Sequence, residues 1–264
     1  MAADGGKSEL NQAGAYHGTG YCDAQCYTTP FIDGEPNLEG YGACCNEMDI
    51  WEANARANTY VPHPCSVDGP YECEGEECEW GGVCDKWGCG YNPYQLGNKD
   101  YYGESSDFKV DTSRPFTVVS QFPADDNGKL LEYRRFYIQD GKKIPQASYN
   151  LTDNEEELGG QNFIDDHFCE VRNSERYNDI GAAKTMGDAM ARGMVLALSV
   201  WWDVGGNMTW LDGLTDGVGP CLDGEGAPSY IEGVQPDTAV IFSKIKWGEL
   251  DSTYTTGCKS KRSH

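Results

Sequence analysis

The sequence predicts an all-β protein built as an antiparallel sandwich or jelly roll. Two long runs are rich in Val, Phe, Tyr and Thr, the composition of β-strands. Turn formers are frequent along the 264 residues, with 33 Gly and 12 Pro, and short strands separated by turns are typical of sandwiches and barrels. Strands do not alternate regularly with helical segments, which argues against a parallel sheet.

The first part of the chain is expected to consist mainly of cross-linked loops. Residues 1–46 are Gly-rich and contain Cys22, Cys26, Cys44 and Cys45, and residues 62–98 are dense in Cys, Gly and Pro. Between these two regions, residues 47–52 form an expected short strand.

A hairpin is expected in the middle of the chain. Its strands are FTVVSQF at 116–122 and LEYRRFYIQ at 131–139, both rich in β-branched and aromatic residues. The segment from Asp125 to Gly128 contains Asn-Gly, a strong turn signal between two strands.

The best helix candidate is 178–192, because Ile180, Ala183, Met186 and Met190 recur at helical spacing. Gly193 is suited to end this helix. We expect two further strands after it: the apolar run Met194–Trp202, which should be buried, and Ala239–Trp247, which alternates in part.

Charge and composition exclude several classes of partner. The chain has 43 acidic and 20 basic residues and a net charge of −23, which argues against binding nucleic acid or an anionic membrane surface. The run 194–202 is too short to cross a bilayer. No Gly-rich loop suited to phosphate is present, so we expect no nucleotide cofactor. Twelve Cys against 4 His indicate an oxidising, extracellular compartment.

Three carboxylates lie within six residues of the expected strand 47–52: Glu47, Asp49 and Glu52. On a regular strand Glu47 and Asp49 point to the same face and Glu52 to the opposite face. One extra residue between Asp49 and Glu52, a β-bulge, would return Glu52 to the first face. Neighbouring carboxylates raise at least one pKa, and an acid beside an ionised partner is the pair that glycoside hydrolysis uses.

Two other interpretations of these carboxylates remain open at this point. In a chain with 43 acidic residues, the three could simply be a solvated strand face. They could also bind calcium, although the spacing lacks the Gly-centred loop of an EF-hand. The apolar neighbours Met48, Ile50 and Trp51 favour a strand whose acids face a cleft.

The same segment, CCNEMDIWEAN followed by PHPC, closely resembles glycoside hydrolase family 7, the fungal-type cellulases. Further matching motifs are GYCDAQC at 20–26, CGYNPYQLGN at 89–98, GMVLALSVWWD at 193–203, NMTWLDG at 207–213 and IKWGELDST at 245–253. The resemblance implies a concanavalin-like β-jelly-roll with long disulfide-stapled loops, acting on β-glucan. It assigns residues 1–253 to one partial catalytic domain and 254–264 to a tail.

The resemblance also implies roles for single residues. Glu47 matches the nucleophile, Glu52 the general acid/base and Asp49 the carboxylate that positions the nucleophile. His63, in PHPC, matches a histidine close to the active centre. Polar groups near the cleaved sugar and sugar-stacking rings are implied for Asp23, Gln25, Trp201 and Trp210. Neither a metal nor a cofactor is implied, and we expect a monomer.

Loop lengths favour an endo-β-1,4-glucanase over a cellobiohydrolase of the same family. The path from Cys78 to Cys84 is only EWGGV, and the path from Trp210 to Cys221 is short and lacks the Arg expected at the product site. Short loops imply an open cleft that accepts a chain anywhere along its length. A non-catalytic, lectin-like jelly roll is another alternative, and the three acids argue against it. A further alternative is an acidic extracellular structural protein, which would neither hydrolyse nor bind glucan. Trp51, Trp80, Trp87 and Trp247 are expected in the core or in loops.

Irregular cysteine spacing does not fit a zinc site. The resemblance implies five disulfides: Cys22–Cys45, Cys26–Cys44, Cys65–Cys84, Cys73–Cys78 and Cys89–Cys169. It pairs Cys221 with a cysteine upstream of Met1 and leaves Cys258 without a partner. Together with a polar N-terminus, this predicts an N-terminally truncated catalytic domain.

Two sequons are present, at Asn150 and Asn207. A glycan at Asn207 would lie between the expected stacking tryptophans, so we favour Asn150.

Overall fold

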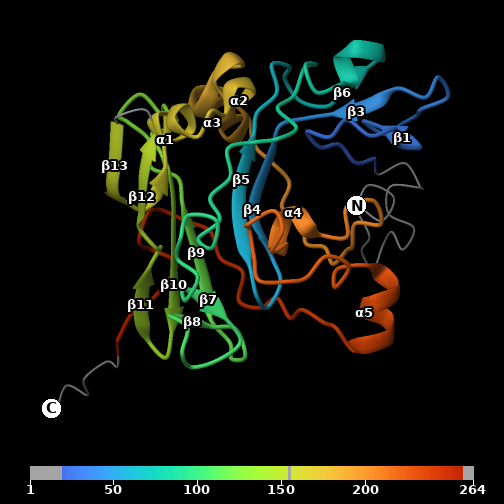
Figure 1. Cartoon of the computed structure of the whole chain (residues 1–264). Helices are drawn as coiled ribbons and strands as arrows, with labels where there is room; N and C mark the ends of the chain where they lie inside the picture. Colours follow the sequence, from blue (N-terminus) through green and yellow to red (C-terminus); the bar gives the residue numbers. More distant parts are fainter. Residues whose placement is uncertain (1–19, 154–155, 258–264) are drawn as a thin grey trace, which may run out of the picture.

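The computed structural model describes residues 20–153 and 156–257 (Figure 1). Short strands dominate, and their pairing is antiparallel except between β7 and β8. The strands are β1 (Phe31–Ile32), β2 (Glu35–Pro36), β3 (Gly42–Cys44), β4 (Glu47–Ala53), β5 (Asn58–His63), β6 (Tyr71–Cys73), β7 (Tyr102–Gly103), β8 (Val110–Asp111), β9 (Thr117–Gln121), β10 (Tyr133–Gln139), β11 (Lys142–Pro145), β12 (Tyr149–Asp153), β13 (Glu156–Gln161) and β14 (Phe163–Ile164). The helices are the 3₁₀ turn η3 (Gly75–Cys78), α1 (Asp166–Val171), α2 (Glu175–Asp179), α3 (Ala182–Arg192), α4 (Thr209–Asp212) and α5 (Pro228–Val234). The predicted all-β class is confirmed.

The β4–β5 hairpin stands in the centre of Figure 1 and forms the first of two β layers, which pack face to face. The second layer contains β10 with β9, β11 and β14 as its partners. Rings from both layers fill the space between them: Trp51 of β4 contacts Tyr137 of β10, with centroids 5.8 Å apart, and the Tyr60 hydroxyl of β5 donates to the Tyr133 carbonyl. This layer holds the back of β4 in place.

The helices α1 to α3 close the main core at the upper end in Figure 1. Phe168, Tyr177 and Met186, one from each helix, are fully buried against Tyr60 and Tyr91. The Cys89–Cys169 disulfide joins this helical group to the loop between η3 and β7. The core therefore couples the helices directly to the central hairpin.

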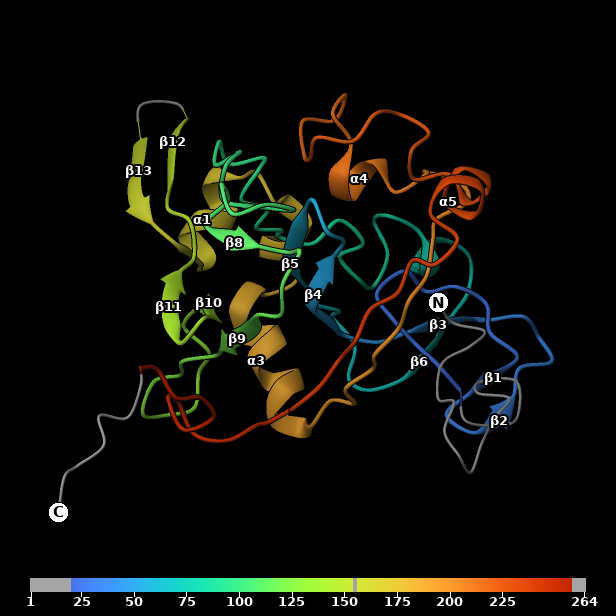
Figure 2. The ribbon, with the colours of Figure 1, turned by 90° about the horizontal axis from the view of Figure 1, so that it is seen from below.

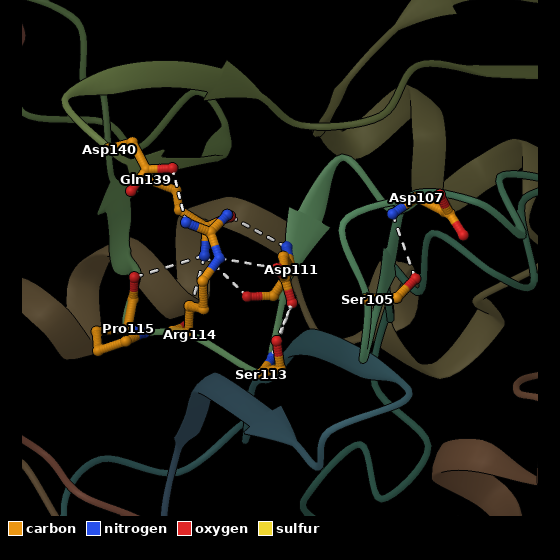
Figure 3. A network of polar contacts seen from close by, with 8 residues as sticks. All are labelled: Ser105, Asp107, Asp111, Ser113, Arg114, Pro115, Gln139 and Asp140. Atoms are coloured by element: carbon orange, nitrogen blue, oxygen red, sulfur yellow. Dashed lines mark hydrogen bonds and ion pairs between the residues drawn. The ribbon is translucent and has the colours of Figure 1, made fainter.

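A polar network ties the loop around β8 to the turn between β10 and β11 (Figure 3). Arg114 donates through Nε to Asp111 Oδ2 and through Nη1 to Asp140 Oδ2, both at 2.8 Å. The buried Gln139 side chain donates to the Asp111 carbonyl at 2.8 Å and accepts from its amide at 3.1 Å. These contacts fix the lower edge of the second layer.

The hairpin predicted at 116–139 is confirmed, with only its strand ends shifted, whereas the helix predicted at 178–192 is not continuous. Strands β9 and β10 pair antiparallel, and the Gly128 amide donates to the Asp125 carbonyl at 2.9 Å in the connecting turn. The expected helix is divided, because Gly181 adopts φ = 99° and separates α2 from α3. Gly193 ends α3, as predicted, but residues 20–153 and 156–257 contain five α-helices where one was expected.

The two strands predicted after α3 are wrong. Residues 194–202 and 239–247 are extended, but neither belongs to a strand in the described part of the chain, and Figure 2 shows both without arrows. Their apolar side chains are exposed, with Val195 at 95%, Val200 at 67% and Ile241 at 90%. A strand needs a neighbour for its backbone N–H and C=O groups, and the described residues pair no strand with either segment.

All five predicted disulfides are confirmed. Among the described cysteines, only Cys221 is free, and it is buried. Cys258 lies outside the described residues, and so does the side chain of Asn150.

Candidate active site

Strand β4 carries the bulge that the carboxylate spacing predicts. Glu47 lies opposite His63 and Asp49 opposite Val61, but Glu52 lies opposite Thr59. Three steps along β4 therefore match two steps along β5, and this one extra residue restores Glu52 to the face of Glu47 and Asp49. Each residue of β4 is partly exposed, so the acids line an open strand face.

Two disulfides hold the segment 22–26 beside the start of β4. Cys22–Cys45 and Cys26–Cys44 fix both ends of this segment to the residues that precede Glu47. The Ala24 amide between them donates to Glu47 Oε2 at 3.0 Å. A backbone donor held in this way favours the ionised form of the Glu47 carboxyl.

Asp23 and Gln25 are both brought to the site, in different ways. Asp23 is buried, and its Oδ1 accepts the Gln25 and Cys26 amides at 2.9 and 3.2 Å. Its carboxylate therefore shapes the segment 22–26. The Gln25 side chain donates from Nε2 to the Lys86 carbonyl at 2.9 Å, which links it to the loop between Cys84 and Cys89.

His63 is clamped between β4 and the same loop. Its Nε2 lies 3.0 Å from Asp49 Oδ2, and its Nδ1 lies 2.8 Å from the Asp85 carbonyl. Gly88 packs against the ring, because a Cβ added there would lie 2.6 Å from His63 Cε1. The ring is buried and held through both nitrogens.

The electrostatics of the face favour one acid that stays protonated. Burial, followed by the charge of Asp49, raises the pKa of Glu52 to about 8. Burial and Asp49 also raise the pKa of Glu47, whereas the charge of His63 and the Ala24 amide act in the opposite direction. Burial lowers the pKa of His63, but the hydrogen bond and charge of Asp49 outweigh it and raise that pKa to about 10. The imidazolium therefore persists over a wide pH range and favours ionisation of its acidic neighbours.

Trp201 and Trp210 lie together, as stacking residues of one site would. Their rings are 5.8 Å apart at 18°, and each residue is more than a third exposed. A sugar between two rings needs about 7–8 Å, since each contact takes about 3.5–4 Å. The gap between the rings is therefore too narrow for a sugar, and the outer faces of the stacked pair are the surfaces that a sugar can contact. Helix α4, which carries Trp210, packs against β5, and Asp212 Oδ2 accepts the Asn54 side chain at 2.5 Å.

The expectation that Trp80 and Trp87 lie in the core or in loops is refined by the structure. Both are exposed, at 50% and 75%, and their rings stack with centroids 4.4 Å apart. Trp51 is in the core, and Trp247 is 89% exposed.

Two residues near the acids were missed by the sequence reasoning. Tyr21 lies near the acids, and burial with the charges of Asp23 and Glu47 raises the pKa of Tyr21. Asp85 binds His63 through its backbone carbonyl. Tyr21 belongs to the GYCDAQC motif, which was a usable signal, whereas a backbone acceptor leaves no signature in side-chain chemistry.

The described residues do not present a set of free metal ligands at this face. The Cys26, Cys44 and Cys84 sulfur atoms lie within 4.8 Å of one another, but all three are in disulfides and cannot coordinate as thiolates. A cavity of about 420 Å³ lies elsewhere, between the loop after Cys65 and α3, and none of the acids of β4 lines it.

Comparison with known proteins gives consistent matches over nearly the whole chain. Residues 1–254 match the family model "Glycosyl hydrolase family 7". Endoglucanase 1 of Humicola insolens is 55% identical over 254 residues, which are 96% of this chain and 62% of that protein. A double mutant of the Humicola insolens endocellulase EGI superposes with a TM-score of 0.84 at 53% identity, covering 96% of this chain and 61% of the other.

A structure of endoglucanase I complexed with cellobiose matches with a TM-score of 0.79 at 51% identity, covering 87% of this chain and 56% of that one. The chain thus spans about 60% of the length of the curated relatives that it matches. The match to the family model extends over 254 of the 264 residues and includes the whole described β-jelly-roll portion. The chain belongs to glycosyl hydrolase family 7.

Proposed function

We propose that the protein is an endo-β-1,4-glucanase that hydrolyses internal bonds of cellulose or related β-glucans with retention of configuration. The observation that carries this proposal is the bulge between Asp49 and Glu52, which puts Glu47 and Glu52 on one face of β4. Two carboxyl groups on one face, in different electrostatic surroundings, are what a retaining glycosidase needs.

In the first step Glu52 is the acid. Its raised pKa keeps it protonated at neutral pH, and it donates the proton to the oxygen of the scissile glycosidic bond. The Glu47 carboxylate attacks the anomeric carbon as the bond to the leaving sugar breaks. The product is a glycosyl ester on Glu47.

In the second step the same residues act in reverse. Glu52, now ionised, removes a proton from water, and the resulting nucleophile attacks the anomeric carbon and displaces Glu47. Two inversions at the same carbon give net retention. The Ala24 amide and the imidazolium of His63 stabilise the Glu47 carboxylate as a nucleophile and again as a leaving group.

The remaining residues bind and orient the sugar. Trp201 and Trp210 supply an apolar platform for the C–H faces of a glucose ring, beside the end of β4. Gln25, whose Nε2 is fixed by the Lys86 carbonyl, offers its amide oxygen to a sugar hydroxyl, while Asp23 holds the backbone of that segment. Asp49 orients His63.

Endo action is supported by the relatives named endoglucanase and by the short connection from Cys78 to Cys84. Extracellular action is part of the proposal, supported by five disulfides, which persist in oxidising compartments. Within the described part of the chain, the helices are all too short or too polar to traverse a bilayer.

The test is hydrolysis of carboxymethylcellulose by the parent chain, Glu47→Gln and Glu52→Gln, with the exposed Glu72→Gln on β6 as the matched control. We expect the parent and the control to lower viscosity much faster than they release reducing ends. The Glu52 variant should lose about 10²–10⁴-fold in kcat, and the Glu47 variant at least as much. Slow viscosity loss with cellobiose as the main product would instead indicate a cellobiohydrolase. Binding without cleavage would indicate a lectin-like protein, and full activity in Glu47→Gln would refute the nucleophile.

A further inference from the structure

Arg135 is a buried cation directly behind the candidate active face. It lies on β10 opposite Ser120 of β9 and is only 3% exposed. Tyr133 and Tyr137 flank it at alternate positions, so all three belong to the face of the second layer that meets the central hairpin. An arginine in this position is costly unless its donors find acceptors.

The guanidinium reaches across to the bulge itself. Its Nη2 donates to the Ile50 carbonyl, and its Nε donates to Ser120 Oγ at 3.2 Å. The group lies over the rings of Trp51 and Tyr60, with its carbon 5.1 and 4.6 Å from their centroids. Among the described residues it forms no ion pair with a carboxylate, and its buried Nη1 has no hydrogen-bond partner. The Ile50 carbonyl and Ser120 Oγ are therefore the acceptors that hold it.

The contact between Arg135 and the Ile50 carbonyl lies where the β4–β5 ladder is interrupted. Ile50 and Trp51 together oppose Tyr60, so the regular alternation of hydrogen bonds is lost there. A carbonyl left without a ladder partner in a packed layer needs another donor. Arg135 provides that donor, and its stacking on Trp51 and Tyr60 fixes the side chains on both sides of the bulge.

We propose that Arg135 is a positioning residue that holds the β4 bulge and thereby keeps Glu52 on the same face as Glu47. This inference deepens the proposed function and rests on it for its consequence in catalysis. Without Arg135, β4 can relax toward a regular ladder, in which Glu52 would turn away from Glu47.

The test uses Arg135→Met and Arg135→Lys, with Arg134→Met as the matched control, since Arg134 is the adjacent, exposed arginine bonded to Glu132. Two readouts are measured: kcat and KM on soluble cello-oligosaccharides, and the titration of the Glu52 carboxyl by ¹³C NMR. In Arg135→Met we expect kcat to fall about 100-fold with little change in KM, and the pKa of Glu52 to move away from about 8. Arg134→Met should match the parent in both.

Arg135→Lys keeps the cation over the rings but has no planar fork to bond Ile50 and Ser120 together. We expect it to fold and to lose about tenfold in kcat. Parental kcat and parental Glu52 titration in either folded Arg135 variant would overturn the proposal. A parent chain that hydrolyses no β-glucan refutes the proposed function, whereas the NMR titration still decides the role of Arg135.

A separate observation concerns Trp87, on the loop that bonds His63 and Gln25. Lys86, before it, accepts Gln25 Nε2 through its carbonyl, and Gly88, after it, packs on the His63 ring. Disulfides at Cys84 and Cys89 hold both ends of the loop. The ring of Trp87 is thus a rigid, 75% exposed apolar face at the edge of the candidate site.

Its neighbours support the ring without covering it. Trp80 stacks on Trp87 with centroids 4.4 Å apart, and Lys86 Nζ lies 5.9 Å from the Trp80 centroid. Trp201 and Trp210 lie toward the Asn54 end of the central hairpin, whereas Trp87 lies toward the His63 end. The two platforms therefore flank the row of acids.

We infer that Trp87, backed by Trp80, binds a glucose unit of a long β-glucan chain beyond the site of cleavage. This inference also rests on the proposed function. The test is calorimetric binding of cellohexaose to catalytically inactive Glu47→Gln, alone and combined with Trp87→Ala or with the control Trp247→Ala. We expect Trp87→Ala to weaken binding roughly threefold to tenfold and Trp247→Ala to have no effect.

Hydrolysis of a short aryl β-cellobioside by Trp87→Ala and Trp247→Ala, each in the otherwise unchanged chain, separates the inference about Trp87 from the proposed function. Trp87→Ala should keep the parental rate on this substrate, because the short chain does not reach the ring. Unchanged cellohexaose affinity in the Trp87 variant would overturn the inference while leaving the proposed function intact.

Discussion

His63 and Asp49 form a diagonal ion pair across the β4–β5 ladder, two residues apart in register, with Nε2 and Oδ2 3.0 Å apart. The pair lies next to Glu47, which is opposite His63 in the register. Its geometry depends on the Asp85 carbonyl, which holds the other ring nitrogen. A single histidine thereby connects the strand that carries the acids to the loop that carries Trp87.

Replacing His63 with Ala should shift the acidic limb of the activity profile to higher pH. The charge of His63 lowers the pKa of Glu47, so its loss makes the carboxylate harder to form. The measurement is kcat/KM against pH on soluble cello-oligosaccharides. His167→Ala, which removes an exposed histidine 3.6 Å from Glu170, should leave the profile in place. An acidic limb that stays fixed in His63→Ala would contradict this electrostatic role.

Activity should fall as the pH rises through about 8, because Glu52 must be protonated to donate to the leaving oxygen. The same profile of kcat/KM provides the measurement for the free protein. A short aryl β-cellobioside with a good leaving group needs less acid assistance, so its glycosylation step should show a weaker alkaline limb. Equal alkaline limbs for good and poor leaving groups would argue against Glu52 as the acid.

Glu52 should also make folding stability depend on pH. Its folded pKa of about 8 lies above the ordinary value of 4.5, so the folded state favours the protonated form. Its contribution is present in full below pH 4.5 and is lost as the pH rises through about 8. Urea unfolding at a series of pH values should show less of this alkaline loss in Glu52→Gln. An identical pH dependence in the parent and the variant would refute the burial of this carboxyl.

The sequence predicts the candidate site more completely than it predicts the sheet around it. The spacing of Glu47, Asp49 and Glu52 requires a bulge if the acids are to share a face, and the ladder contains it. Arg135 was not singled out, although its alternation with Tyr133 and Tyr137 places it on a buried strand face. A charged residue in a strand is usually expected at the surface. The partner of Arg135 becomes clear only from the structure, in which the β4 bulge lies on the facing layer.

The strands predicted at 194–202 and 239–247 show the limit of pattern reasoning. Alternating or continuous apolar residues indicate that a segment is suited to a buried strand, but pairing depends on a neighbour that the segment itself does not encode. In the described structure these residues remain extended and exposed. The resemblance, in contrast, specifies both cysteines of each disulfide, and all five pairs are confirmed.

The disulfides should contribute unequally to stability. Cys89 and Cys169 are 80 residues apart, whereas Cys73 and Cys78 are only 5 apart. Closing the longer loop removes more entropy from the unfolded chain, which gives about 4.5 kcal/mol against about 2 kcal/mol in the chain-entropy description. Urea unfolding of the two double Cys→Ser variants measures the difference. Equal losses, or a larger loss for the short loop, would show that native packing rather than chain entropy dominates.

The exposed segments 194–202 and 239–247 should make the 264-residue chain self-associate. Val195, Ile241 and Trp247 are each about nine-tenths exposed, on extended backbone that has no ladder partner in the described structure. Exposed apolar strand-like segments outside a sheet are templates for pairing between molecules, and a charge in such a segment blocks that pairing. Ultracentrifugation should therefore show concentration-dependent association of the parent chain and less association of Val195→Lys combined with Ile241→Lys. The control is Leu38→Lys, which replaces an 88% exposed leucine in the loop after β2 and should associate like the parent. If the control dissociates as far as the double variant does, added charge in general, rather than these two segments, governs association.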